Sequence, residues 1–117
     1  YEDRTGPLAV EKWLKEEMAD KVDCFFSCDA YLEVVPKGMS KGEAVKMLCR
    51  MMDIPIENAV AVGDAANDLS MIEMAGIGVA MANGEEHIKQ AADIIADDCN
   101  DFGAAKILEQ IIEEQRR

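Results

Sequence analysis

Acidic and amide side chains gather where an apolar stretch of this sequence stops. Residues 59–62 are apolar and have strand length, and Asp64, Asn67 and Asp68 follow shortly before a helix-like segment at residues 69–75. Open α/β sheets place their chemistry at the carboxyl ends of strands, so three oxygen-bearing side chains here favour a hard cation such as Mg²⁺ with a bound phosphate. The alternative is a helix N-cap, where Asp, Asn and Ser are common. Capping does not explain two acids and an amide on one turn, but the spacing alone leaves both interpretations open.

A lysine occupies an unusual position earlier in the chain. Lys41 stands in the first turn of a helix that we predict from Ser40 onward. Helix N-termini already carry positive partial charge, so a cation there is favourable when an anion is held between the two. The alternative is an ordinary surface lysine. The same helix has an apolar face, formed by Ala44, Val45, Leu48, Met51 and Met52.

Composition excludes several classes of function. The chain has 117 residues, half of them hydrophobic, with 12 Lys and Arg against 24 Asp and Glu, for a net charge of −12. This charge repels nucleic acid and anionic lipid, so we expect no nucleic-acid and no membrane partner. No apolar stretch is long enough to span a bilayer, and no signal-peptide pattern is present. The four cysteines form no Cys-x-x-Cys pair, so buried free thiols in a reducing cytoplasm are the simplest account.

The hydrophobic pattern predicts an α/β chain. After an irregular start that breaks at Gly6-Pro7, a helix is expected at residues 8–20 and an antiparallel strand pair at 22–27 and 31–35. From there strands alternate with helices, which implies a parallel sheet with right-handed crossovers. The predicted strands are residues 59–62, 76–81 and 94–95, and the predicted helices are residues 40–52, 67–75, 85–92 and 102–115.

Four motifs stand in a distinctive order along the chain: Ser40-Lys41-Gly42, then Gly63-Asp64-Ala65-Ala66-Asn67-Asp68, then residues 78–84, then Ala91-Ala92-Asp93. From about Tyr31 to Ile112 they resemble the haloacid dehalogenase superfamily, in particular its Cof-like sugar-phosphate phosphatase branch. Members of that family open with an Asp-x-Asp-Gly-Thr segment that supplies the nucleophile, followed later by a Ser or Thr that holds the phosphoryl group. Neither occurs in this sequence. The chain therefore resembles the C-terminal portion of such an enzyme.

The resemblance implies a fold and a division of the chain. Residues 1–36 would be the last helix and strands of an α/β cap, and residues 37–117 the C-terminal half of a Rossmann-like core with parallel strands. The turn from Pro36 to Met39 would be the hinge between them. The partner of the chain would be the missing N-terminal half of the same enzyme. A sheet without its central strands has an unpaired edge, so self-association or strand exchange is expected.

The resemblance also implies roles for individual residues. Lys41, Asn67 and Asp68 would be catalytic: the lysine would contact the phosphoryl oxygens, Asn67 would contact or be positioned by the phosphoryl site, and Asp68 would orient Lys41 or metal-bound water. Asp64 would bind Mg²⁺, with Asp68 at or beside the metal. Asn83-Gly84 matches a loop beside the site in relatives, although a left-handed turn explains it equally well. Asp93, Asp97 and Asp98 are expected to be solvated loop acids.

Three functions are compatible with these residues. The first is a fragment of a Mg²⁺-dependent phosphatase that acts on small phosphorylated metabolites through an aspartyl-phosphate, with the nucleophile outside this chain and the chain alone inactive. The second is a non-catalytic, truncated module for binding or assembly. The third is a receiver-like phosphoacceptor domain, which is weakened because Lys41 precedes the acids and belongs to a helix. Intact Lys41, Asp64, Asn67 and Asp68 favour the first.

Overall fold

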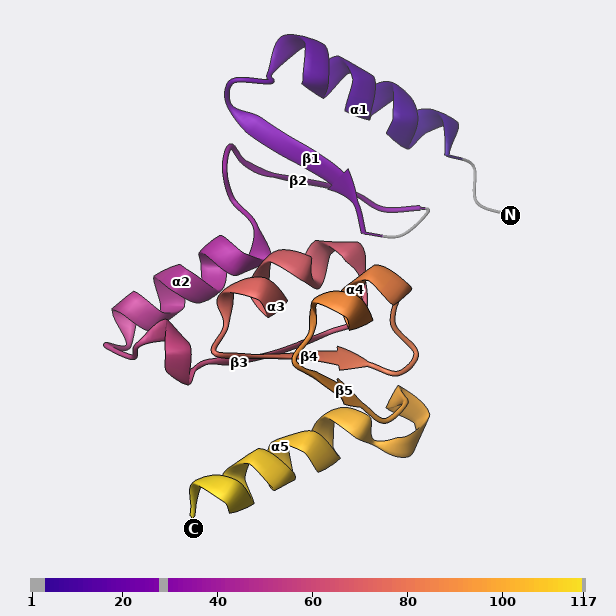
Figure 1. The fold of residues 1–117 in the computed structure, drawn as a ribbon. Coiled ribbons are helices and arrows are strands. Elements are labelled where there is room, and N and C mark those ends of the chain that lie inside the picture. The colour runs from indigo at the N-terminus through magenta and orange to yellow at the C-terminus, as the bar shows by residue number, and fades with distance from the viewer. Residues whose placement is uncertain (1–3, 28–29, 117) are drawn as a thin grey trace. The chain divides into compact units, whose positions relative to one another are not determined.

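The chain divides into two compact units, residues 1–40 and residues 41–117. The structure is a computed structural model that describes residues 4–27 and 30–116 (Figure 1). Its α-helices and strands in chain order are α1 (Thr5–Glu17), β1 (Val22–Phe26), β2 (Leu32–Pro36), α2 (Lys41–Met51), β3 (Val60–Gly63), α3 (Leu69–Met74), β4 (Ile77–Met81), α4 (Glu86–Ala91), β5 (Ile94–Ala96) and α5 (Gly103–Gln115). Three short 3₁₀ turns are η1 (Ile56–Asn58), η2 (Ala66–Asp68) and η3 (Cys99–Asp101).

The first unit consists of α1 and an antiparallel pair of strands. β1 and β2 are antiparallel, as the sequence predicts, and their register places Cys24 opposite Val34. The predicted break at Gly6-Pro7 is wrong, because α1 already begins at Thr5. Proline is tolerated in the first turn of a helix, where its missing N–H has no partner to lose.

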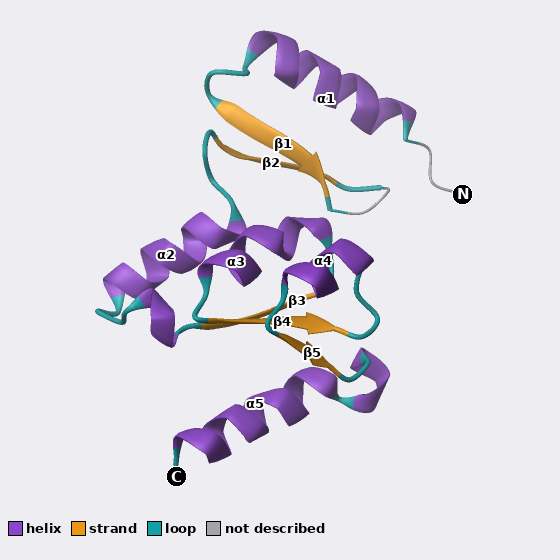
Figure 2. Cartoon of the chain, in the orientation of Figure 1, coloured by secondary structure: helices purple, strands orange, loops and turns teal. Residues whose placement is uncertain are grey.

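The second unit contains a parallel three-stranded sheet in the order β3-β4-β5 (Figure 2). Its register pairs Val62 with Val79 and Ala80 with Ile95. Parallel strands covered on both faces have continuous apolar sequences, and the Ile-Gly-Val-Ala-Met sequence of β4 is of this kind. The predicted α/β class with parallel strands is confirmed.

Helices cover the sheet on both faces (Figure 1). On one face, α5 packs through Ile107 against Val79 and Met81 of β4. On the opposite face, Ile72 of α3 and Ile88 of α4 pack together against Ala80. Val79 and Ile88 have no exposed surface, so β4 lies at the centre of the core.

The predicted apolar face of α2 is largely exposed instead of buried. Leu48, Met51 and Met52 are 55%, 78% and 60% exposed. The residues of α2 that are buried are Gly42 and Cys49, and Gly42 lies against Ser70 and Met74 of α3. The apolar face predicted for this helix is therefore present, and it leaves a hydrophobic surface open on α2.

Candidate active site

The site forms where the chain leaves β3 and folds back on itself through η2. Gly63 is the last residue of β3, and a Cβ atom built there would lie 2.4 Å from the Cβ of Asp68. Any side chain at residue 63 would therefore displace Asp68. The glycine allows the aspartate to lie directly against the end of the strand.

Asp68 is buried and fully engaged in hydrogen bonds. It is only 4% exposed, and its Oδ1 accepts a hydrogen bond from Lys41 Nζ. Its Oδ2 accepts from the backbone N–H of Asp64 at 2.9 Å and of Ala65 at 3.2 Å. Burial raises the pKa of the Asp68 carboxyl, but the hydrogen bonds from Lys41 and from the two backbone groups outweigh it, so the pKa stays below its ordinary value. Asp68 is therefore a carboxylate at neutral pH.

Lys41 is the first residue of α2, and its ammonium is only partly used by Asp68. Its side chain is 45% exposed. An ammonium has three N–H donors, and one of them is directed at Asp68 Oδ1. The remaining donors can bind an anion beside the positive end of the helix. The structure thus brings together two residues that are 27 positions apart and that the sequence assigns to one site.

Asp64 lies at the open side of this arrangement. It is exposed, and among the described residues no hydrogen bond or ion pair involves its carboxylate. Its backbone is fixed from two sides, because its N–H donates to Asp68 and its carbonyl accepts from the N–H of Glu85 at 2.9 Å. A Cβ at Gly84 would lie 3.0 Å from the Asp64 Cα, so the loop after β4 packs against this residue.

Asn67 and the Asn83-Gly84 pair, the other two features that the sequence places at or beside the site, make no hydrogen bond with Lys41 or Asp68 within the part of the chain that the structure describes. Asn67 is half-buried in η2, and within residues 4–27 and 30–116 its side chain has no hydrogen-bond partner. Asn83 accepts a hydrogen bond from the Cys99 N–H through Oδ1 at 2.9 Å. Neither Asn83 nor Gly84 has a positive φ, so a left-handed turn does not explain that pair.

The fit of these residues to Mg²⁺ is partial. Mg²⁺ prefers oxygen ligands, and the exposed carboxylate of Asp64, which has no partner among the described residues, is of that type. Both oxygens of Asp68 already accept hydrogen bonds. Across residues 4–27 and 30–116, no group of three or more His, Cys, Asp or Glu side chains could hold a metal ion. The described residues therefore offer one direct ligand rather than a complete coordination shell.

Two polar side chains make contacts that the sequence analysis does not predict, one beside the site and one at the start of β4. Ser70 Oγ accepts a hydrogen bond from the N–H of Gly42 at 2.9 Å, which joins α3 to α2. Asp93 was expected to be a solvated loop acid, but its Oδ2 accepts from the N–H of Gly78 at 2.8 Å. Both contacts join segments far apart in the sequence, so local pattern gives no signal for them.

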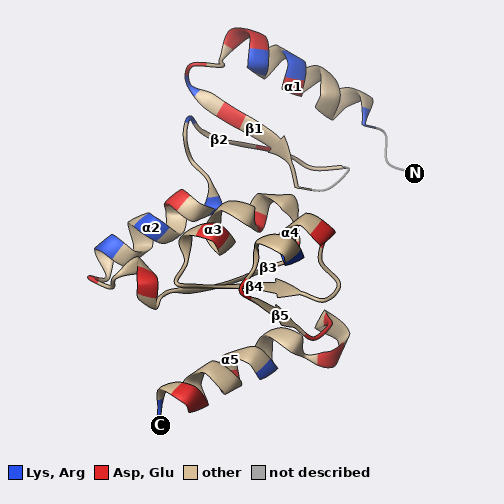
Figure 3. Cartoon of the chain, viewed as in Figure 1, with Lys and Arg blue, Asp and Glu red and all other residues tan. Residues whose placement is uncertain are grey.

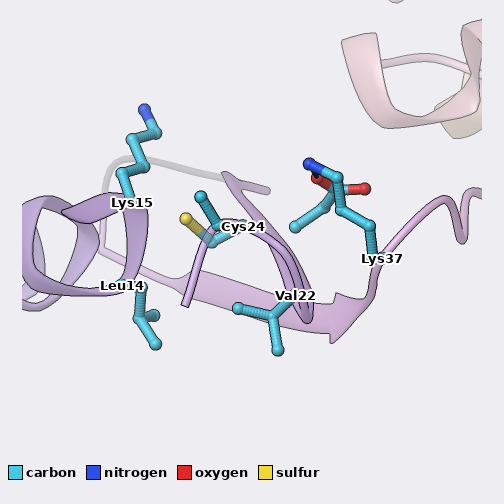
Figure 4. Close-up of a pocket in the computed structure, with 7 residues that line it drawn as sticks. Leu14, Lys15, Val22, Cys24 and Lys37 are labelled. Atoms are coloured by element: carbon cyan, nitrogen blue, oxygen red, sulfur yellow. Dashed lines mark hydrogen bonds and ion pairs between the residues drawn. The ribbon is translucent and has the colours of Figure 1, made fainter. Parts of the chain in front are cut away.

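A separate cavity of about 210 Å³ lies in the first unit, between α1 and β1 (Figure 4). Lys15 and Lys37 line it together with Cys24. The ammonium of Lys15 is 2.6 Å from Glu11, and that of Lys37 is 2.9 Å from Asp23. Because both cations are already paired with carboxylates, this cavity is a weak candidate for binding an anion.

Charged side chains are spread over both units, with acidic ones in excess (Figure 3). A phosphorylated ligand would be repelled by this overall charge, which makes the local cation at Lys41 more important. In the part of the chain that the structure describes, no helix has the length and apolar character needed to cross a membrane.

Known phosphatases are similar to this chain in sequence and in structure. It is 37% identical to Phosphatase YwpJ of Bacillus subtilis over 100 aligned residues, and this alignment covers 86% of this chain and 35% of YwpJ. A haloacid dehalogenase-like hydrolase from Bacteroides thetaiotaomicron superposes with a TM-score of 0.84 and 38% identity, over 93% of this chain and 41% of that one. The subclass IIB sugar phosphatase BT4131 of the same superfamily superposes with a TM-score of 0.74 and 28% identity, over 89% of this chain and 40% of that one.

These relatives are much longer than the sequence in hand, which spans between a third and a half of each. Residues 1–108 match the haloacid dehalogenase-like hydrolase family, and this match includes Lys41, Asp64, Asn67 and Asp68. The resemblance found in the motifs is confirmed: the chain belongs to the haloacid dehalogenase-like hydrolase family.

Proposed function

We propose that this chain is part of a Mg²⁺-dependent phosphatase that hydrolyses small phosphorylated metabolites such as sugar phosphates. The observation that carries the proposal is the contact between Lys41 and the buried Asp68, next to Asp64, whose carboxylate has no partner among the residues that the structure describes. A cation held by a buried anion, next to an oxygen ligand for a metal, is the arrangement that phosphoryl transfer requires. The names of YwpJ and of BT4131, a phosphatase and a sugar phosphatase, support the substrate class.

In this proposal the reaction has two steps, and the chain supplies their electrostatics. A carboxylate of an aspartate outside this chain attacks the phosphorus, and the alcohol of the metabolite leaves. Water then hydrolyses the aspartyl-phosphate and releases inorganic phosphate. Lys41 holds the phosphoryl oxygens through the N–H donors that Asp68 does not use, and its charge offsets the negative charge that develops on them.

Asp68 keeps Lys41 in place during both steps. Its pKa is held low, so it remains a carboxylate and does not release the ammonium at neutral pH. Asp64 is the residue we assign to Mg²⁺, and the metal, when bound, supplies Lewis-acid stabilisation of the phosphoryl group. Asp68 does not bind the metal directly in this proposal, since both of its carboxylate oxygens already accept hydrogen bonds from the chain. Asn67 is proposed to contact the phosphoryl group.

Exposed apolar surface supports the proposal that the rest of the enzyme packs on this chain. We assign residues 1–36 to the cap and residues 37–117 to the core, a division close to that of the two compact units. Among the described residues of the second unit, the apolar side of α2 is exposed and β3 pairs with β4 alone. In the first unit, Trp13 is 54% exposed. We propose that the missing half of the catalytic core covers the surfaces of the second unit.

A reducing, cytoplasmic location is part of the same proposal. Cys24, Cys49 and Cys99 are free thiols. Disulfide-forming compartments tend to oxidise such residues, and the cytoplasm keeps them reduced.

The test is a Mg²⁺ titration of the 117-residue chain followed by NMR, together with an assay for hydrolysis of p-nitrophenyl phosphate. We expect the Asp64 signals to shift with Mg²⁺, the Asp64→Asn variant to lose this shift, and the chain alone to release no phosphate. Asp93→Asn, which alters a carboxylate away from the end of β3, is the matched control and should respond as the wild type does. No response at Asp64 would favour the non-catalytic binding or assembly module. Turnover by the pure chain would show that no outside nucleophile is needed.

A further inference from the structure

A hydrogen bond joins the start of α2 to the start of α3. The backbone N–H of Gly42, the second residue of α2, donates to Ser70 Oγ at 2.9 Å. Gly42 is buried and Ser70 is half-buried. The first N–H groups of a helix have no partner within the helix, so this one would be unsatisfied without the serine.

The two helices also approach each other unusually closely at this point. A Cβ at Gly42 would lie 2.7 Å from both Met74 Sδ and the carbonyl oxygen of Ser70. Gly42 therefore lies directly against the backbone of Ser70 and the side chain of Met74. The close packing and the hydrogen bond therefore both hold Gly42 against Ser70.

The two residues of this contact are close in sequence to two residues of the candidate site. Lys41 directly precedes Gly42, and Ser70 follows Asp68 by two residues. Two bonds consequently join the same two segments: the Lys41 ammonium to the Asp68 carboxylate, and the Gly42 N–H to the Ser70 hydroxyl. The second bond holds the backbone from which the lysine extends.

We propose that Ser70 is a positioning residue, which fixes the N-terminus of α2 so that the Lys41 ammonium stays against Asp68 and points its other donors at the ligand. The inference rests on the proposed function for its role in phosphoryl transfer, but its structural content concerns only Lys41, Gly42, Asp68 and Ser70. A lysine side chain has four rotatable bonds, so its ammonium is precisely located only if its backbone is held as well.

The direct test measures the motion of the Lys41 ammonium by ¹⁵N relaxation in the whole 117-residue chain labelled at lysine. In the wild type we expect an ordered ammonium, and in Ser70→Ala one as mobile as the ammonium of an exposed lysine. Ser70→Thr retains the hydroxyl and should restore the order. Asn83→Ala is the matched control, because it also removes a side-chain acceptor of one backbone N–H, that of Cys99. An equally ordered ammonium in folded Ser70→Ala would overturn the proposal and leave Ser70 as a packing contact.

A second measurement covers the case in which Ser70→Ala does not fold. If the two bonds support each other, Lys41→Met should accelerate hydrogen exchange of the Gly42 amide by on the order of tenfold, as expected for neighbouring interactions that couple. An unchanged exchange rate would contradict the coupling. Neither readout needs a substrate, so both remain decisive if phosphatase activity is never found. Within an active parent enzyme, Ser70→Ala should lower kcat more than it changes KM, and Ser70→Thr should recover it.

Discussion

Replacing Asp68 by asparagine should destabilise the second unit, although the two side chains have nearly the same shape. An amide has one oxygen, so it can accept either from Lys41 or from the two backbone N–H groups, and its NH₂ then faces a donor on the other side. Breaking a fully buried ion pair costs about 3–5 kcal/mol. The Lys41 side chain is 45% exposed and regains water, so we expect a loss of about 2 kcal/mol in the free energy of unfolding.

The assay is urea unfolding at neutral pH, followed by far-UV circular dichroism. The only tryptophan, Trp13, belongs to the first unit, so its fluorescence reports on that unit separately. Asp93→Asn is the control, because that carboxylate is exposed, accepts one backbone N–H and can do so equally well as an amide. If Asp68→Asn costs less than about 0.5 kcal/mol, the range of ordinary surface substitutions, the hydrogen bonds of Asp68 do not hold the site together.

Three further predictions concern the ionisation of Asp68, the glycine at residue 63 and the exposed apolar side of α2. The pKa of Asp68 in the folded chain is lower than its ordinary 3.8. The ionised carboxylate therefore stabilises the fold above pH 3.8, and this stabilisation is lost as the pH falls through the pKa of the folded state. Urea unfolding at stepwise lower pH should show this loss in the wild type and not in Asp68→Asn. Gly63→Ala places a Cβ 2.4 Å from the Asp68 Cβ and should cost about 1–3 kcal/mol by the same assay, whereas a neutral effect would mean that Asp68 moves freely. The isolated chain should self-associate in light scattering, and Leu48→Gln with Met51→Gln should reduce its mass toward the monomer; a monomeric wild type would count against an open docking surface on α2.

The elements of the fold could be predicted because they follow local rules. Apolar runs of strand length alternate with helical patterns, and the parallel order of β3, β4 and β5 follows from that alternation. The contact between Lys41 and Asp68 could be predicted only because the motifs resemble a known family, since spacing alone left a helix cap and a surface lysine as alternatives.

What escaped prediction depends on contacts between distant segments. The apolar pattern of α2 predicts an apolar face, but it does not say whether any described element covers Leu48 and Met51. The helical pattern around Ser70 gives no sign of a distant partner, and its contact is visible only once Gly42 is placed against it. Gly63 was recognised as the end of a strand, whereas the reason for a glycine there is the return of Asp68.

The most direct test of the account is Mg²⁺-dependent phosphate release by the complete gene product purified from its source cell, compared with the same protein carrying Lys41→Met. We predict turnover of p-nitrophenyl phosphate that is lost on chelation of Mg²⁺ and reduced by two or more orders of magnitude in the variant, as expected when a donor to the transition state is removed. A folded gene product without activity, or a Lys41→Met variant as active as the wild type, would contradict the assignment of this site to phosphoryl transfer.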